Sequence, residues 1–333
     1  MSAHPKISVV MSAYNSEDYV GEAIDSILNQ SFGDFEFVII NDGSTDRTPD
    51  ILSEYQKTDH RIKVVNQENL GLTRSLNRGV KLAAVEYIAR QDADDISEPN
   101  RLQKQLSFME AHLNVAVVGC LSYVFNDDGI VRAGEAPKFR LSNAGIKRYL
   151  AKKNLFTHGS AMIRKSALAQ TGLYREFFRH AQDYDLWLRL SEHSDLAILP
   201  EHLYRYRVTP EAASVARCRT QQCYAGVARK LHAERLATGR DSYDKLSSSH
   251  PDGLPVVDVP NRYDYHIFLT GEFLAGNNLK QARRQLRQAW KLGCRRPRLF
   301  YLFLKSLIGA GLLDIGRKLR KAALESLASR TDN

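Results

Sequence analysis

The hydrophobic and polar positions of the first 130 residues alternate between two kinds of segment. Short runs rich in β-branched residues predict strands, and the longer segments between them repeat apolar positions with a helical period. The predicted strands cover residues 7–14, 35–42, 61–67, 85–92 and 115–125, and the predicted helices cover 16–30, 43–57, 72–84 and 97–112. Ser16 is expected to cap the first helix, and Ser44, Thr45 or Asp46 the second. This order indicates an α/β fold with a doubly wound, mostly parallel sheet.

The alternation becomes less regular after residue 125. The elements predicted there are a strand, turn and helix over 156–176, an amphipathic helix over 180–193, a strand over 196–208, and helical segments over 265–276, 279–293, 297–311 and 315–329. Residues 241–261 are rich in Ser, Pro, Gly and Asp, and this composition predicts a linker. We therefore expect one α/β domain over 1–215, a helix and linker over 216–262, and a basic α-helical domain over 263–330.

The net charge of +9 is concentrated in the C-terminal part of the chain. Residues 272–333 carry fourteen Lys and Arg against four Asp and Glu, so the rest of the chain is close to neutral. The basic clusters are Arg283, Arg284 and Arg287, then Arg295, Arg296 and Arg298, then Arg317, Lys318, Arg320 and Lys321. Two interpretations stay open: attraction to an anionic membrane surface, at about 1 kcal/mol per basic residue, or a scaffold that docks a partner enzyme. No nucleic acid partner is expected, because no recognised nucleic-acid-binding module accompanies the charge.

Neither a zinc site nor a membrane span is expected. The cysteines are Cys120, Cys218, Cys223 and Cys294. They form no C-x-x-C pair, and the histidines show no H-E-x-x-H spacing. The N-terminal residues lack the basic and apolar regions of a secretory signal. The longest apolar stretch, residues 299–313, is interrupted by Lys305 and is shorter than the roughly 20 residues that a span needs. We therefore expect a cytoplasmic protein.

Polar side chains cluster where three of the predicted strands end. The clusters are "SAYN" (Ser12, Tyr14, Asn15), "NDGSTD" (Asn41, Asp42, Asp46) and "DADD" (Asp92, Asp94, Asp95). The carboxyl ends of parallel strands meet at one edge of a sheet, and ligands bind in the crevice beyond them. We therefore expect the three clusters to form one site. Asp42 could accept hydrogen bonds there from a base or ribose, although a helix-capping turn is the alternative.

The acidic cluster after the fourth strand predicts a cation site. On a strand, Asp92 and Asp94 project to the same side whereas Asp95 turns away. Paired carboxylates suit Mg²⁺ or Mn²⁺, hard ions that keep positions open for water and phosphate oxygens. The alternative is a solvated acidic turn in which Asp95 or Ser97 caps the next helix. The chain has no G-x-x-x-x-G-K and no G-x-G-x-x-G after the first strand, which argues against a P-loop enzyme and a dinucleotide dehydrogenase.

Four ordered strings carry a resemblance to a known family. They are "SVVMSAYNSEDYVGEAIDSILNQSFGDFEFVIINDGSTDRT", "NLGLTRSLNRGV", "EYIARQDADDISEPNRLQKQ" and "HAQDYDLWLRL". Over residues 6–210 they closely resemble the family 2 glycosyltransferases of the GT-A fold. The resemblance implies an inverting transferase that moves a sugar from a nucleotide diphosphate sugar, expected to be a UDP-sugar. The acceptor would be a hydroxyl of a glycan or lipid-linked molecule in surface polysaccharide biosynthesis.

The resemblance also implies roles for individual residues. The donor-binding residues would be Ser12, Tyr14, Asp42 and Asp92. Asp92 and Asp94 would form the D-x-D motif that holds Mn²⁺ or Mg²⁺ against the diphosphate. Asp183 of "QDYDLW" would be the general base that deprotonates the acceptor hydroxyl while the metal stabilises the leaving group.

Three departures and alternatives bear on these roles. Many family members have Glu where this chain has Gln182, so a supporting negative charge is missing beside Asp183. Only the motif favours Asp183 over Asp185 as the base. His158 of "THGSAMIRK" falls where relatives often have a histidine near the acceptor, and the alternative is a structural histidine.

Arg205 and Arg207 of "LYRYRV" either face the acceptor or a phosphate, or are solvated on an edge strand. The Q-x-x-R-W signature of processive members is absent, which favours a single addition.

Two other function classes stay open. A sugar-phosphate nucleotidyltransferase is expected to show a Gly-rich, Lys-containing loop after the first strand, which "SAYNSEDY" lacks. A non-catalytic nucleotide-sugar-binding scaffold is expected to lose Asp183 or the D-x-D, and both are present.

Overall fold

The structure is a computed structural model that describes residues 5–134, 142–210, 212–256, 258, 263–294 and 297–308. The chain divides into two compact units. The first comprises Met1–Tyr123, Gly134–Arg207 and Cys218–Val257, and the second comprises Val124–Ala133, Val208–Arg217 and Asp258–Asn333. The domain limits at 215 and 262 stay predictions.

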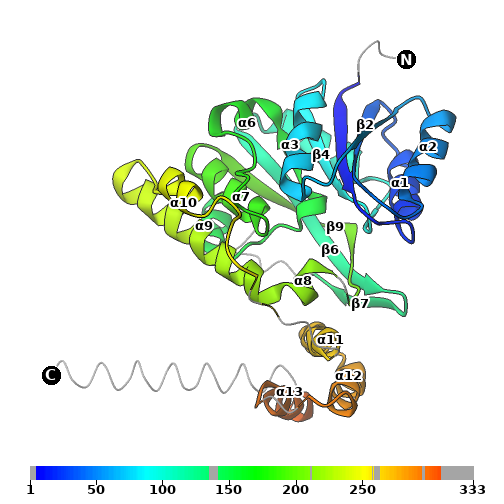
Figure 1. The fold of residues 1–333 in the computed structure, drawn as a ribbon, viewed down its shortest axis with the longest axis vertical. Helices are drawn as coiled ribbons and strands as arrows, with labels where there is room; N and C mark the ends of the chain where they lie inside the picture. Colours follow the sequence, from blue (N-terminus) through cyan, green and yellow to red (C-terminus); the bar gives the residue numbers. More distant parts are fainter. Residues whose placement is uncertain are drawn as a thin grey trace. The chain divides into compact units, whose positions relative to one another are not determined.

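Within the described residues, nine strands form one sheet (Figure 1). They are β1 (Ile7–Ala13), β2 (Phe35–Asp42), β3 (Ile62–Gln67), β4 (Tyr87–Asp92), β5 (Ile96–Ser97), β6 (Val115–Asn126), β7 (Gly129–Ala133), β8 (Met162–Arg164) and β9 (Asp195–Arg207). Their order is β3-β2-β1-β4-β8-β6-β9-β5, with β7 paired to β6. Strands β3, β2, β1 and β4 are parallel, whereas β8 is antiparallel to β4 and to β6. The predicted α/β fold class is confirmed, and the parallel half of the sheet carries the three predicted polar clusters.

Most of the described helices were predicted, whereas the short ones over 143–150, 213–216 and 243–249 were not. They are α1 (Val20–Leu28), α2 (Thr48–Thr58), α3 (Leu72–Leu82), α4 (Arg101–Ala111), α5 (Asn143–Leu150), α6 (Lys165–Thr171), α7 (Gln182–His193), α8 (Ala213–Ala216), α9 (Cys218–Thr238), α10 (Tyr243–Ser249), α11 (Asp264–Ala275), α12 (Leu279–Lys291) and α13 (Pro297–Ile308). A short 3₁₀ turn covers His158–Ser160. The predicted helix over 315–329 lies outside the described residues.

The first two helices begin about one turn later than predicted, and their expected caps are different. Helix α1 starts at Val20, and the Ser16 hydroxyl donates to the carbonyl of Tyr14 instead of capping the helix. Helix α2 starts at Thr48, although Asp46 still accepts a hydrogen bond from the amide of Thr48. The reason is that the residues before each helix bond to the neighbouring loop, so they are not available to extend the helix.

Alternate residues of β1 pack into different cores on the two faces of the sheet, as a strand period of two requires. Val9 and Met11 belong to a core with residues of α1 and α4. Val10 belongs to the other core, with residues of α3 and α7. Both faces of the parallel half are therefore covered, and only the edges of the sheet are open to ligands.

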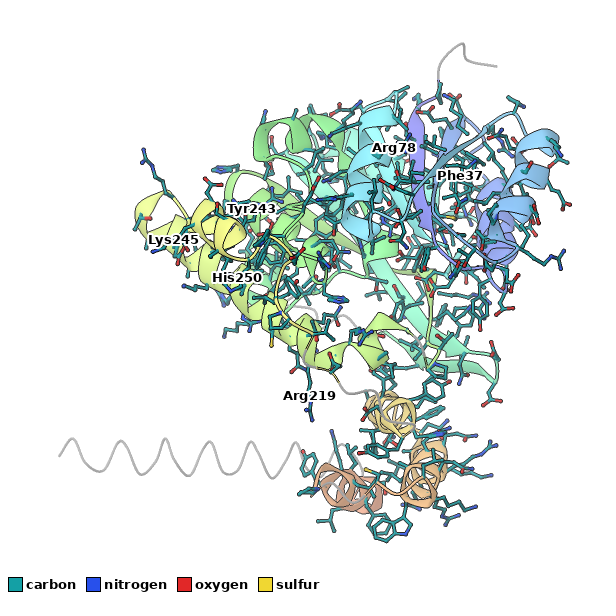
Figure 2. The ribbon with its side chains drawn as sticks, viewed as in Figure 1. Phe37, Arg78, Arg219, Tyr243, Lys245 and His250 are labelled. Atoms are coloured by element: carbon teal, nitrogen blue, oxygen red, sulfur yellow. The ribbon has the colours of Figure 1, made fainter. Side chains whose placement is uncertain are left out.

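Residues 241–256 differ from the linker that their composition predicts. They contain α10, and Asp241 forms ion pairs with Arg175 (2.8 Å) and with Arg235. The Arg175 guanidinium lies 4.1 Å from the centre of the Tyr243 ring, at the start of α10 (Figure 2). Partly buried charge pairs and ring contacts thus tie this segment to the first unit.

The second unit contains the helices α11, α12 and α13. Arg132 of β7 pairs with Glu272 of α11 at 2.7 Å, and the Asn126 amide donates to the Tyr265 hydroxyl at 3.2 Å. Among the described residues, no helix combines the length and hydrophobicity needed to cross a bilayer.

We predict opposite effects from adding a methyl group to two helical glycines. A Cβ at Gly79 of α3 would lie 2.5 Å from Cγ1 of the buried Val10, whereas a Cβ at Gly226 of α9 would meet only Arg229, at 3.9 Å. Gly79→Ala should lower the free energy of unfolding by about 1–3 kcal/mol through overpacking. Gly226→Ala should raise it by about 0.5–1 kcal/mol through helix propensity. Urea denaturation measures both, and changes of the same sign would contradict the packing described here.

Candidate active site

The ends of β1, β2 and β4 meet at one edge of the sheet. The Cα of Ser12 lies opposite Ile40 on β2 and opposite Asp92 on β4. Ala13, the last residue of β1, lies opposite Asn41. The "SAYN", "NDG" and "DADD" clusters therefore lie on adjacent strand ends (Figure 1).

The loops after β1 and β2 are joined by hydrogen bonds. The Asn15 amide donates to the Ser44 hydroxyl at 3.1 Å, and the Thr45 amide donates to the Asn15 side chain at 2.8 Å. Asn15 adopts a φ of 46°, in the left-handed region that asparagine tolerates. The bonded loops leave Tyr14 with 49% of its surface exposed, so its ring is available for stacking against a ligand.

Asp42 fastens the loop that follows β3. Its buried carboxylate accepts hydrogen bonds from the side chain of Gln67 at 2.7 Å and from the amides of Leu70 and Gly71, both at 2.9 Å. The next residue, Gly43, has a φ of 73°, and a Cβ there would lie 2.6 Å from the amide nitrogen of Asn69. Asp42 thus has a structural function that the sequence did not predict, and its contact with a ligand stays a prediction.

The three carboxylates of "DADD" occupy a turn rather than a continuous strand, because β4 ends at Asp92. Asp92 forms an ion pair with the buried Arg90, and its side chain is 26% exposed. Asp95 is fully buried and accepts a hydrogen bond from the amide of Arg207 at 2.7 Å. Asp94 is partly buried. Asp92 and Asp94 are therefore the members of the turn with access to solvent.

Arg207 supports this turn from β9. Its Nε donates to the carbonyl oxygen of Asp94 at 2.8 Å, and its guanidinium pairs with Glu22 and lies 4.5 Å from the centre of the Tyr19 ring. Arg205 instead pairs with Glu98 at 2.5 Å. Arg207 is buried, so the alternative in which both arginines are solvated is wrong for this residue.

The residues fit a divalent cation. Burial and the charge of Asp92 raise the pKa of Asp94 to about 6. A cation beside both carboxylates would relieve this repulsion, and carboxylate oxygens are the ligands that Mg²⁺ and Mn²⁺ prefer. In the part of the chain that the structure describes, no group of three or more His, Cys, Asp and Glu side chains is arranged to hold a metal. Asp92 and Asp94 would leave coordination positions open for water and substrate oxygens.

Asp183 lies in the first turn of α7 with its side chain buried. The Asn154 amide donates to its carboxylate at 2.7 Å, and the Asn154 oxygen accepts from the amide of Phe156 at 3.1 Å, which fixes the orientation of the Asn154 side chain. Burial raises the pKa of Asp183 to about 6, and the charge of Asp92 contributes. The two carboxylates are therefore within electrostatic reach of each other.

Asp185 has a different environment. It is fully buried and pairs with Arg189 at 2.9 Å and with Arg175 at 3.6 Å. The donors of Arg189 also bind the carbonyl oxygens of Thr171 (2.9 Å) and Leu173 (2.8 Å). Asp185 is thus part of a structural charge network, which distinguishes it from Asp183.

His158 lies in the 3₁₀ turn beside Asp92. Its Nε2 is 2.9 Å from the Tyr174 hydroxyl, and burial and the charge of Arg90 hold its pKa well below the usual range, so the imidazole is neutral. A Cβ on the next residue, Gly159, would lie 2.6 Å from Oδ2 of Asp92. The hydrogen bond fits a structural histidine, and a contact of His158 with the acceptor stays a prediction.

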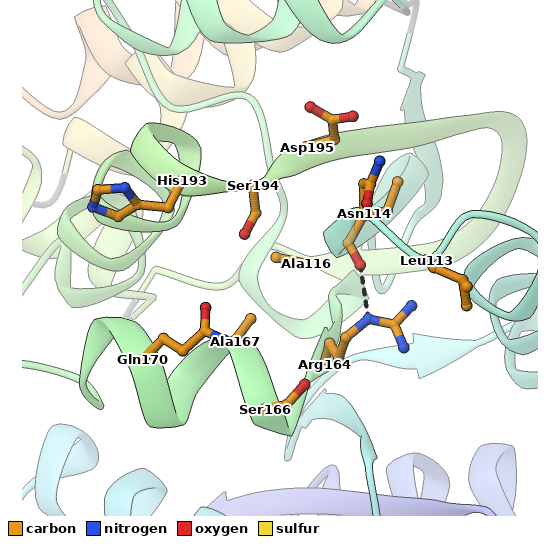
Figure 3. A pocket seen from close by; sticks show the side chains of 11 residues that line it. Leu113, Asn114, Ala116, Arg164, Ser166, Ala167, Gln170, His193, Ser194 and Asp195 are labelled. Carbon is orange, nitrogen blue, oxygen red and sulfur yellow. Dashed lines mark hydrogen bonds between the residues drawn. The ribbon is translucent and has the colours of Figure 1, made fainter.

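Two cavities lie at the opposite edge of the sheet, near the amino ends of the strands. One, of about 440 Å³, is lined by residues that include Asn114, Arg164 and Asp195, and Nε of Arg164 donates to the carbonyl of Val115 at 3.2 Å (Figure 3). The other, of about 790 Å³, includes Phe35 and Lys63. Neither of these two cavities is lined by a predicted site residue.

Sequence reasoning missed Arg90 and Asn154. Arg90 carried a signal, because it stands two positions before Asp92 on one strand and therefore projects to the same face. Asn154 carried none, since its contact with Asp183 joins a loop to a helix that begins 28 residues later.

Comparison with known proteins is consistent with this geometry. The family described as Glycosyl transferase family 2 matches residues 8–172. The putative glycosyltransferase EpsE of Bacillus subtilis is 40% identical over 217 residues, which cover 64% of this chain and 76% of that protein. The O-antigen biosynthesis glycosyltransferase WbnJ of Escherichia coli is 32% identical over 237 residues, which cover 70% of this chain and 91% of that protein.

The fold is similar to that of the mannosyltransferase PcManGT from Pyrobaculum calidifontis, solved in complex with GDP-Man and Mn²⁺. The TM-score is 0.55 at 17% sequence identity, and the match covers 96% of this chain and 81% of that chain. This likeness supports the fold alone.

The raised pKa of Asp183 predicts a pH-dependent stability. In the unfolded chain the carboxyl titrates near 4, whereas in the folded chain it titrates at about 6. The folded state therefore binds this proton more tightly than the unfolded state does. The free energy of unfolding that this proton contributes is lost as the pH rises from about 4 to about 6. At pH about 7.5, Asp183→Asn should raise the free energy of unfolding by roughly 1–3 kcal/mol, and at pH about 4 this gain should vanish.

Urea denaturation in chelator measures this difference. Asp252→Asn is the matched control, because the Asp252 side chain is 97% exposed. A variant of Asp183 that is no more stable than the unaltered protein at the higher pH would contradict the assignment.

Proposed function

The chain belongs to the family 2 glycosyltransferases, and we propose that it moves a sugar from a nucleotide diphosphate sugar to an acceptor hydroxyl with inversion at the anomeric carbon. The observation that carries this proposal is the placement of Asp183, a buried carboxyl of raised pKa on α7, within electrostatic reach of Asp92 at the end of β4. The proposal thus pairs a base on α7 with carboxylates at the end of β4 that could hold a cation for the diphosphate.

Asp183 is the proposed general base. As the acceptor oxygen attacks the anomeric carbon, its proton passes to the Asp183 carboxylate, and the bond from the sugar to the diphosphate breaks on the opposite face. One displacement of this kind inverts the configuration. With a pKa of about 6, Asp183 is mostly ionised at neutral pH and remains a stronger base than an ordinary aspartate. The neighbouring Gln182 adds no charge, so the Asn154 amide is the direct support of the base.

The donor is proposed to lie across the strand ends. Tyr14, with its exposed ring, would stack on the base, and Ser12 and Asp42 would bind the ribose side. Asp92 and Asp94 would hold Mn²⁺ or Mg²⁺ at the diphosphate. When bound, the ion supplies positive charge that stabilises the departing diphosphate.

The substrates are proposed from the relatives. WbnJ is named for O-antigen biosynthesis, and PcManGT was solved with GDP-Man and Mn²⁺ bound. We propose surface polysaccharide assembly on the cytoplasmic side of the membrane, with a glycan or lipid-linked acceptor. A UDP-sugar, which the family resemblance implies, is the proposed donor, and a panel of UDP- and GDP-sugars with Mn²⁺ tests it by thermal stabilisation of the protein.

Two substitutions should separate donor binding from transfer. Asp94→Asn should abolish Mn²⁺-dependent binding of the donor, because it removes one of the two metal-binding carboxylates. Asp183→Asn should keep donor binding and lower the transfer rate by about 10² to 10⁴. Calorimetry measures binding, and product formation measures transfer. Asp252→Asn serves as the control, and an Asp183→Asn enzyme with undiminished transfer would remove the assignment of the base.

Removing the amide that supports Asp183 should move the pH profile of transfer. The Asn154 hydrogen bond lowers the pKa of Asp183, so Asn154→Ala should raise it. The acid limb of kcat/KM should therefore shift to higher pH, above the wild-type midpoint near 6. Lys153→Ala, at the exposed neighbouring position, is the control. An unshifted acid limb in Asn154→Ala would mean that another group titrates.

A further inference from the structure

Helix α12 presents an exposed basic face, defined here as Lys280, Arg284, Arg287 and Lys291. These residues follow one another at spacings of four, three and four, so they line one side of the helix. All four are exposed. The other side of α12 is buried through Ala282, Leu286 and Ala289. The basic face is therefore a surface feature of a packed helix.

The charge of this face is not neutralised within the described protein. Helix α12 contains five basic residues and no acidic residue. The fifth, Arg283, donates to the carbonyl oxygen of Ser306 at 2.7 Å and so joins α12 to α13. No member of the basic face forms an ion pair with a carboxylate of the described residues. The face is thus available to an anionic partner.

Exposed apolar side chains lie on α12 and on α13. Trp290 (55% exposed) directly precedes Lys291, the last residue of α12. Tyr301 (53%) and Phe303 (45%) are exposed on α13, where their spacing of two residues puts them on different sides of the helix. Across the residues that the structure describes, Tyr14 is the only other exposed large aromatic side chain. Leu292 and Leu304 are also exposed. Aromatic and leucine side chains beside Lys and Arg are the composition of a surface that lies in the interface of a lipid bilayer.

We propose that α12 binds the surface of an anionic lipid bilayer, with the basic face on the lipid headgroups and the neighbouring Trp290 in the interfacial layer. The charge favours an anionic partner. The exposed Trp290 and Leu292 at the end of α12 favour a bilayer over a nucleic acid, whose backbone offers them no apolar layer. This surface does not depend on the proposed sugar transfer, and lipid binding can be measured without any donor or acceptor.

Tryptophan fluorescence tests the proposal on the full chain. The protein has two tryptophans: Trp187, which is fully buried in the first unit, and the exposed Trp290. Vesicles of equimolar phosphatidylcholine and phosphatidylglycerol should shift the emission to shorter wavelength, because Trp290 leaves water. Pure phosphatidylcholine vesicles should not. In Trp290→Phe, vesicle binding measured by sedimentation should persist and the shift should vanish.

A charge variant tests the contribution of the basic face. The triple variant Arg284→Ser, Arg287→Ser, Lys291→Ser should bind anionic vesicles about 100-fold more weakly. The matched control, Lys57→Ser, Lys81→Ser, Lys245→Ser, removes the same charge from exposed lysines of the first unit (Lys245 is labelled in Figure 2) and should bind like the unaltered protein. Circular dichroism establishes that both variants are folded.

Three results would overturn the proposal. The first is an emission spectrum that does not change when anionic vesicles are added. The second is an equal weakening of vesicle binding in the triple variant and in its control. The third is that the protein does not bind vesicles but binds a DNA or RNA duplex, and that the triple variant loses this binding.

Discussion

The site depends on the pairing of buried arginines with an acidic turn. Two carboxylates about 5 Å apart repel by roughly 3 kcal/mol at an effective dielectric near 20, and the turn after β4 carries three. Arg90 offsets this repulsion by pairing with Asp92. Arg207 of β9 donates from its guanidinium to the carbonyl of Asp94 and from its backbone amide to the carboxylate of Asp95. These contacts therefore fix the shape of the turn before any substrate binds.

The strands of the parallel half could be predicted because each carries its own signal. Strand β2 has the predicted limits of 35–42, since its apolar run over 37–40 ends at the polar Asn41 and Asp42. The starts of α1 and α2 could not be predicted in the same way. Their positions depend on hydrogen bonds between the loops after β1 and β2, such as that from the Thr45 amide to Asn15, which lies 30 residues earlier.

The position of the site could be predicted from the sequence, but the hydrogen bonds and ion pairs within the site could not. The strand ends that carry Ser12, Asp42 and Asp92 are adjacent because parallel strands end at one edge, which is a rule of topology. The partners of the acidic side chains are specified by tertiary contacts, and Arg207 lies 113 residues from Asp94. Asp42 is the clearest example of a contact that the sequence does not predict. Its short motif gave no indication that its carboxylate oxygens accept hydrogen bonds from the loop after β3.

The ion pairs of Asp241 set a lower limit on the length of a functional fragment. Asp241 neutralises Arg175, which also pairs with Asp185, two residues beyond the proposed base. A shortened protein that stopped at the end of α9 would leave Arg175 and Arg235 without this carboxylate. Arg175 would then be held less firmly against Asp185 of α7. Any attempt to crystallise or transplant the α/β unit alone should therefore retain the chain to residue 256.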